Sequence, residues 1–108
     1  MRSPLIRAVV VGPSMLPTLA AGDWLVVRRL AGGHQVKAAQ IVLVEHPARP
    51  GLLLVKRAVR RTQQGWWVEG DNPAASEDSR SFGAVPDPLV IGRVLARYHP
   101  SARLLRTA

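Results

Sequence analysis

Short apolar runs, rich in β-branched residues, recur along the chain and are separated by residues that favour turns. Each run has the length of a strand, and Gly, Pro, Asp or Asn fills most of the breaks. No stretch shows the 3.6-residue period of an amphipathic helix. The pattern predicts an all-β domain, with strands at residues 6–11, 24–28, 40–44, 52–61, 66–69 and 89–98.

Turn residues also predict how these strands are connected. Gly65 separates two adjacent runs and predicts a hairpin. Residues 70–88 are dominated by Gly, Asp, Asn, Pro and Ser, a composition typical of a long ordered loop. We therefore expect one domain over 1–108, with its core in 6–98 and a frayed basic tail at 101–108.

Composition narrows the class of protein. The 108 residues have room for one hydrophobic core, and the mean hydropathy is +0.06. Apolar runs such as 8–11 and 52–55 are too short to cross a bilayer, and Arg7 and Gly12 interrupt any signal peptide. The chain has no cysteine, so disulfides and thiolate catalysis are excluded. We expect no transmembrane anchor and a cytoplasmic location.

The charge is strongly basic but unevenly divided between residue types. A net charge of +8 favours an anionic partner. Thirteen of the fifteen basic residues are Arg, and only Lys37 and Lys56 are Lys. Arginine cannot release its proton at neutral pH, whereas a buried lysine can. The two lysines are therefore candidates for proton chemistry.

Ser14 is the candidate nucleophile, because it follows a predicted strand and lies between Pro13 and Pro17. A serine hydroxyl needs a nearby base, and backbone amides to stabilise the resulting oxyanion. Taken alone, this serine also fits ordinary turn chemistry.

The base is sought among histidine and lysine. His34, His46 and His99 follow or precede Gly or Pro in predicted turns, so we expect exposed loop histidines and no metal site. Lys56 interrupts an apolar strand, where burial would lower its pKa. It could instead extend its amine into solvent.

Two further segments have loop chemistry, Gly22–Asp23 and residues 70–83. In the second, Asp78 and Arg80 could pair and hold the loop's shape, and a serine hydroxyl such as that of Ser76 could orient an amine.

Taken in order, four segments resemble the conserved boxes of the type I signal peptidase family: Ser14–Thr18, Gly22–Asp23, Val55–Arg57, and residues 70–85. The resemblance covers roughly residues 6–96. It implies a small catalytic β-barrel or folded sheet with long loops, like that of the self-cleaving SOS repressors. It also implies a serine endopeptidase with a Ser/Lys dyad and no cofactor.

The resemblance assigns roles position by position. Ser14 becomes the nucleophile, Lys56 the general base, and Ser76 the residue that orients the Lys56 amine. The oxyanion hole would include the Ser14 N–H, with Gly12 where some members carry a hydroxyl donor. The residues implied to be structural near the site are Asp71, Asn72, Asp78 and Arg80.

The family's substrate binds as an extended strand, which implies β-augmentation in this chain. The residues implied to contact it are Val11, Gly12, Pro13, Met15, Leu53, Leu54 and Val55. With its small size and expected lack of an anchor, the chain resembles the subgroup of this family that removes the N-terminal propeptide of nickel-type superoxide dismutase. The expected partner is therefore that precursor.

Three alternatives remain. One is a processing peptidase for another precursor. The second is a self-cleaving protein related to the SOS repressors. It is disfavoured, because thirteen residues before Ser14 are too few for a cleavage arm and a DNA-binding domain. The third is a basic β-barrel that binds nucleic acid through Trp66 and Trp67, which the scattered positions of the basic residues disfavour. We expect no nucleic-acid partner.

Overall fold

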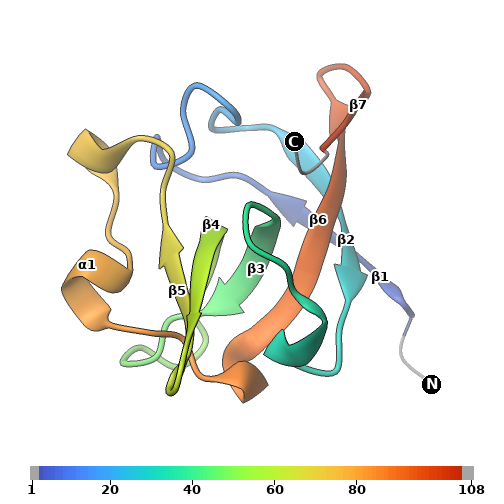
Figure 1. The fold of residues 1–108 in the computed structure, drawn as a ribbon. Helices are drawn as coiled ribbons and strands as arrows, with labels where there is room; N and C mark the ends of the chain where they lie inside the picture. The colour runs from blue at the N-terminus through green and yellow to red at the C-terminus, as the bar shows by residue number, and fades with distance from the viewer. Residues whose placement is uncertain (1–2, 106–108) are drawn as a thin grey trace.

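The apolar runs form one seven-stranded antiparallel sheet, which confirms the all-β prediction. The structure, a computed structural model, describes residues 3–105. Hydrogen-bonded neighbours follow the order β1-β2-β6-β3-β4-β5, and β7 pairs with β6 (Figure 1). The sheet is folded but not closed. The strands are β1 (Leu5–Val9), β2 (Trp24–Arg29), β3 (Ile41–Glu45), β4 (Leu53–Thr62), β5 (Gly65–Glu69), β6 (Val90–His99) and β7 (Arg103–Leu104).

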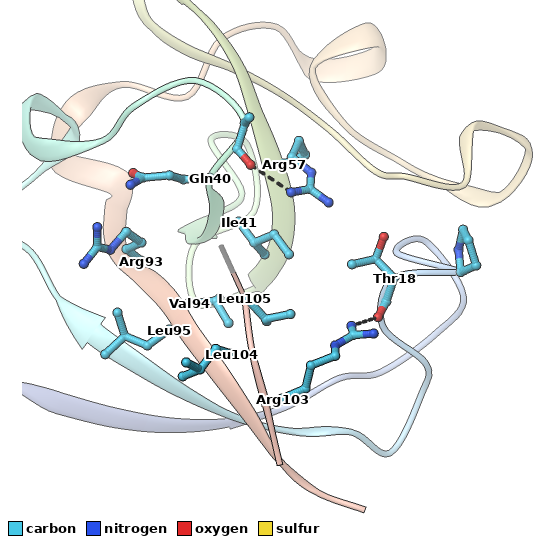
Figure 2. A pocket seen from close by; sticks show the side chains of 12 residues that line it. Thr18, Gln40, Ile41, Arg57, Arg93, Val94, Leu95, Arg103, Leu104 and Leu105 are labelled. Atoms are coloured by element: carbon cyan, nitrogen blue, oxygen red, sulfur yellow. Dashed lines mark hydrogen bonds between the residues drawn. The ribbon is translucent and has the colours of Figure 1, made fainter. Parts of the chain in front are cut away.

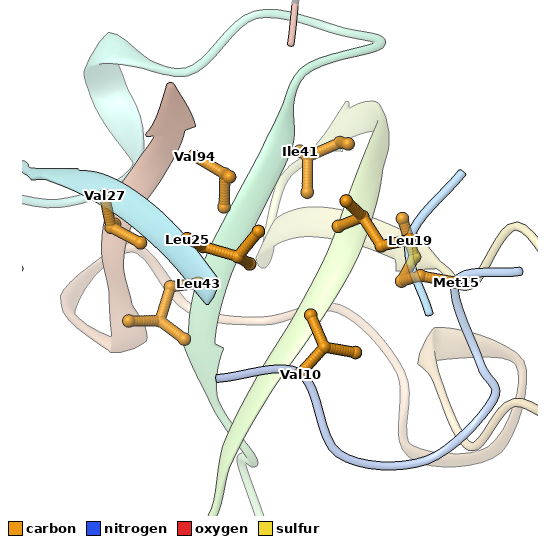
Figure 3. Packing of buried hydrophobic residues seen from close by; sticks show 8 residues of the cluster. All are labelled: Val10, Met15, Leu19, Leu25, Val27, Ile41, Leu43 and Val94. Carbon is orange, nitrogen blue, oxygen red and sulfur yellow. The ribbon is translucent and has the colours of Figure 1, made fainter. Parts of the chain in front are cut away.

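Two hydrophobic clusters stabilise the sheet, and β3 contributes to both. Successive side chains of a strand point to opposite faces, so Ile41 and Leu43 enter one cluster while Val42 and Val44 enter the other. The first cluster (Figure 3) consists of Val10, Met15, Leu19, Leu25, Val27, Ile41, Leu43 and Val94. The second consists of Val36, Val42, Val44, Ala58, Trp66, Val68, Val85 and Val90.

Short helices and one short strand differ from the expected pattern. The polar segment 70–88 contains the 3₁₀ turn η2 (Pro73–Ala75) and the four-residue helix α1 (Ser79–Phe82), and the 3₁₀ turn η3 (Asp87–Leu89) begins at its end. Another 3₁₀ turn, η1 (Gly33–Gln35), precedes β3. The expected frayed tail is ordered as far as it is described, because β7 pairs with β6; residues 106–108 lie outside the described residues.

The sheet leaves two strand edges unpaired near each other. Within β4, β5 pairs only with Arg57–Thr62, the second half of the strand, so residues 53–56 have a free edge within the described chain. Among residues 3–105, β1 ends the order of the sheet and pairs only with β2. Both edges border the cavity described below. No helix among residues 3–105 is long and apolar enough to cross a membrane.

Candidate active site

Ser14 lies in a turn that the hydrophobic core anchors from below. Met15 and Leu19 follow it and are each only 1% exposed in the first cluster (Figure 3). The Leu19 N–H donates to the Met15 carbonyl at 2.9 Å. Asn72 makes two hydrogen bonds to this turn. Its backbone N–H donates to the Ser14 carbonyl at 2.9 Å, and its side-chain amide donates to the Pro13 carbonyl at 3.1 Å. Buried side chains and an opposing loop thus hold the Ser14 backbone.

Lys56 is buried in β4, with 3% of its surface exposed. Its Nζ–H donates a hydrogen bond to Ser76 Oγ at 3.1 Å. Burial lowers the pKa of the Lys56 amine, and the charges of Asp78 and Glu77, which raise it, do not offset that effect. The strand therefore buries this amine rather than directing it into solvent, which decides between the two alternatives that the sequence left open.

Asp78 organises the loop that carries Ser76. Its Oδ2 accepts from Ser76 Oγ at 2.6 Å, from the Gly70 N–H at 2.9 Å and from Arg80 at 2.6 Å. Burial would raise the pKa of this carboxyl, but the bonds from Arg80, Ser76 and Gly70 outweigh burial and hold the pKa well below its usual range. The expected Asp78–Arg80 pair is present.

A second ion pair joins three of the sequence segments. Arg57 follows Lys56 in β4, so its side chain leaves the opposite face of the strand. It donates to Asp71 at 2.7 Å, and Asp71 accepts from Thr18 Oγ1 at 2.5 Å. The loop before Ser76 is thereby attached both to β4 and to the turn that carries Ser14.

Gly70 lies where these segments meet. A Cβ there would clash with Ser76 Oγ and with the Ser14 carbonyl oxygen. Only a residue without a side chain allows this approach. The sequence shows this glycine in a turn-rich segment, but it does not show that the position faces two other parts of the chain.

Ser14 and Lys56 line the same cavity, which has a volume of about 270 Å³. Its walls come from β1, from the turn after it and from the first half of β4. The expected substrate-binding residues Val11, Met15, Leu53, Leu54 and Val55 also line it, whereas Gly12 and Pro13 do not. The cavity is therefore bounded by both unpaired strand edges.

A larger cavity of about 550 Å³ lies on the Arg57 side of β4, against β3, β6 and β7 (Figure 2). Arg57 donates to the Ala39 carbonyl at 2.8 Å, and Arg103 donates to the Thr18 carbonyl. Neither Ser14 nor Lys56 lines this cavity. Of the two cavities, Ser14 and Lys56 therefore line only the smaller one.

The expectation for the histidines is wrong at one position. His34 and His99 are exposed, but His46 is 5% exposed and its Nε2 lies 2.9 Å from Glu77 Oε1. The partner lies 31 residues further along the chain, so the local sequence could not reveal it. No group of three or more possible metal ligands occurs among the residues that the structure describes.

The tryptophan pair does not form a stacking surface. Trp66 is 5% exposed, and its indole N–H donates to the Gly33 carbonyl at 2.8 Å. Trp67 packs against the Arg60 guanidinium, 4.5 Å from the ring centroid. These contacts argue against the nucleic-acid alternative, because bases need an open aromatic face.

The sequence matches the family described as signal peptidase, peptidase S26, over residues 1–60 and 62–99. The chain belongs to this family of peptidases. Membership agrees with the order of the sequence boxes, and with a buried lysine and a serine that share one cavity.

Similar proteins carry the names of mitochondrial inner membrane protease subunits. Subunit 1a of the ATP-independent protease of Arabidopsis thaliana is 33% identical over 84% of this chain and 68% of that protein. Subunit 1 of Xenopus tropicalis is 31% identical over 82% of the chain and 66% of that protein. Subunit 2 of Saccharomyces cerevisiae is 29% identical over 89% of the chain and 69% of that protein. The chain spans about two thirds of the length of these signal peptidase relatives.

These names correct one expectation. The relatives are named as inner membrane proteases, which contradicts the cytoplasmic location expected from the cysteine-free sequence. Lack of cysteine excludes disulfides, but it does not by itself assign a protein to a compartment.

Proposed function

We propose that the chain is a serine endopeptidase in which Ser14 is the nucleophile and Lys56 the general base. The observation that carries the proposal is the buried Lys56 amine, held by Ser76 in the cavity that Ser14 lines. Burial favours the neutral amine, the form that can accept a proton.

Ser76 orients the amine through the direction of its own proton. Its hydroxyl proton is directed to Asp78 Oδ2, so its oxygen accepts from Lys56. In the neutral amine, one N–H is then engaged by Ser76, and the lone pair stays free to accept a proton. Such an amine can accept the proton of the Ser14 hydroxyl.

The reaction proceeds in two halves. Ser14 Oγ attacks the carbonyl carbon of the scissile peptide as its proton moves to Lys56 Nζ, and the intermediate then expels the amine, which takes that proton. A water molecule, deprotonated by Lys56, then attacks the acyl-enzyme ester. The acid product leaves, and Ser14 regains its proton from Lys56.

The oxyanion is expected to bind backbone N–H groups. The Ser14 N–H donates no hydrogen bond among the described residues and is available for this role. Gly12 has a positive φ of 82°, where an L side chain is strained, so the backbone conformation favours glycine over a hydroxyl-bearing residue. The proposed oxyanion hole therefore consists of backbone groups.

The substrate is expected to bind as an extended strand. The free edge of residues 53–56 and the outer edge of β1 both offer backbone hydrogen-bonding groups at the cavity. Val11, Met15, Leu53, Leu54 and Val55 would contact its side chains, with Gly12 and Pro13 adjoining along the backbone.

Substitutions with matched controls test the peptidase. Ser14→Ala and Lys56→Met should each abolish cleavage of a precursor, measured by the intact mass of the products. Ser81→Ala and Lys37→Met alter an exposed serine and an exposed lysine and should retain cleavage. Cleavage retained by Ser14→Ala or by Lys56→Met would refute the dyad.

We propose the precursor of nickel-type superoxide dismutase as the substrate, with removal of its N-terminal propeptide exposing the nickel-binding N-terminus. The sequence resemblance supports this choice; the names of the relatives do not extend to it. The test compares cleavage of that precursor with cleavage of an unrelated precursor that carries a signal peptide. Exclusive cleavage of the second would refute the substrate and leave the peptidase intact.

A further inference from the structure

His46 lies at the end of β3 in a fixed orientation. Its ring packs against Phe82 of α1, with the ring centroids 4.5 Å apart. The Ala48 N–H donates to its Nδ1 at 3.0 Å, so Nδ1 is the acceptor nitrogen. In the neutral ring the proton therefore resides on Nε2, which donates to Glu77 Oε1 at 2.9 Å.

Glu77 is the residue between the two side chains that determine the surroundings of Lys56. Ser76 accepts from the Lys56 amine, and Asp78 accepts from Ser76. Because planar peptide bonds join the three residues, restraining Glu77 limits how far the neighbouring backbone can turn. A contact made by Glu77 thus influences Ser76.

The Glu77 side chain would otherwise be free to move, since it is 54% exposed. Its other ion-pair partner among residues 3–105 is Arg49, at 3.9 Å and itself 64% exposed, a geometry that contributes little. His46 is different, because burial, Phe82 and Ala48 already fix its ring before it binds Glu77. An ordered donor loses less conformational entropy when it forms the bond.

We propose that His46 is a positioning residue of this peptidase: its Nε2–H holds Glu77 and so keeps Ser76 Oγ on the Lys56 amine. The inference rests on the proposed function for its catalytic consequence. It assigns a role to a buried, hydrogen-bonded imidazole that the reaction itself does not use.

Two substitutions separate hydrogen bonding from packing. His46→Phe keeps an aromatic ring against Phe82 but removes the donor to Glu77. His46→Gln places an amide N–H near the position of Nε2 and restores the donor. We expect His46→Phe to lower kcat about tenfold with an unchanged KM, and His46→Gln to recover most of that loss. His34→Phe, at an exposed histidine, is the matched control.

Lysine NMR tests the positioning without relying on catalysis. The chain has two lysines, so isotope labelling of lysine Nζ and Cε gives two sets of signals. The set that disappears in Lys37→Arg belongs to Lys37, and the other set belongs to Lys56. In His46→Phe the Lys56 signal and its titration midpoint should shift, while those of Lys37 stay in place. In His46→Gln the Lys56 signal and its titration midpoint should match those of the wild-type protein.

The outcomes are distinguishable. Equal kcat loss in His46→Phe and His46→Gln, or wild-type kcat and an unchanged Lys56 signal in folded His46→Phe, would overturn the positioning role. Failure of the peptidase proposal would appear instead as cleavage by Ser14→Ala or by Lys56→Met. In that case the Lys56 signal still decides whether His46 positions the amine.

Discussion

The Lys56 Nζ–H donates to Ser76 Oγ at 3.1 Å, and the two residues come from segments that lie on different parts of the fold. Lys56 belongs to a regular strand, whereas Ser76 lies in a loop between η2 and α1. The strand buries the Lys56 amine, which favours its neutral form, and the loop residue Ser76 orients that amine. Each contribution can be removed separately.

Ser76→Ala should remove the hydrogen bond that orients the Lys56 amine and leave the amine buried. We expect kcat to fall about tenfold to a hundredfold with little change in KM, because a misdirected amine lowers the efficiency of general-base catalysis. Steady-state kinetics on a precursor peptide measures both parameters. Ser81→Ala, in the same segment, should behave as the wild-type protein. A Ser76→Ala variant with full kcat would show that the amine needs no partner.

Lys56→Met should make the protein more stable at neutral pH while it abolishes activity. The folded-state pKa of Lys56 lies below its value of 10.5 in the unfolded chain, so between the two values the unfolded state binds more protons. Wild-type stability therefore rises with pH through that window and is lowest below it. The methionine variant lacks this dependence and should gain about 1 kcal/mol at pH 7.

Urea unfolding between pH 6 and pH 10 measures this gain, with Lys37→Met as the control. The advantage of the methionine variant should narrow as the pH rises. An advantage that is constant or absent over the whole range would contradict a depressed lysine pKa.

Gly70→Ala should damage the site more than the fold. The added methyl group meets Ser76 Oγ and the Ser14 carbonyl oxygen, so the loop must move away from both. We expect kcat to fall by about a hundredfold or more, since small displacements of reacting groups have effects of this size. Gly83→Ala is the control, because a Cβ there meets nothing within 4 Å and adds only the strain of a positive φ. Similar activities of the two variants would count against the convergence at Gly70.

Much of the fold followed from local pattern, because alternating apolar residues and turn residues define strands over five to ten positions. The pattern also placed Lys56 inside an apolar strand, but it left burial and exposure of the amine as alternatives, and only the folded structure decides between them. Helix α1 did not follow from the pattern, since four residues are too few to show a helical period. His46 did not either: a histidine before a proline predicts an exposed turn, and burial arises from Phe82 and Glu77, more than thirty residues away. Tertiary contacts of this kind leave no local pattern.

Met15→Ala tests how the core supports the nucleophile. Met15 is 1% exposed in the first cluster, so truncation leaves a cavity directly beneath Ser14. We expect a loss of about 2–5 kcal/mol in the free energy of unfolding, together with reduced kcat at temperatures where the protein stays folded. Leu16→Ala, at a neighbour that is 39% exposed, should cost far less. Chemical denaturation and kinetics on the same samples distinguish the two effects.

Acid should unfold the protein partly through Asp78. Its folded-state pKa is depressed, so its contribution is complete above the unfolded carboxyl pKa and is lost as the pH falls through the folded value. Asp78→Asn removes the charge that accepts from Ser76 and Gly70, and should cost about 2–3 kcal/mol at pH 7. Asp87→Asn breaks a more exposed pair with Arg61 and should cost less. The difference in unfolding midpoint between Asp78→Asn and the wild-type protein should shrink as the pH falls from 4 towards 2, because the unfolded wild-type chain then binds a proton at Asp78 while the folded protein keeps the carboxylate ionised. Midpoints that stay parallel would mean that Asp78 stabilises the loop by packing instead of by charge.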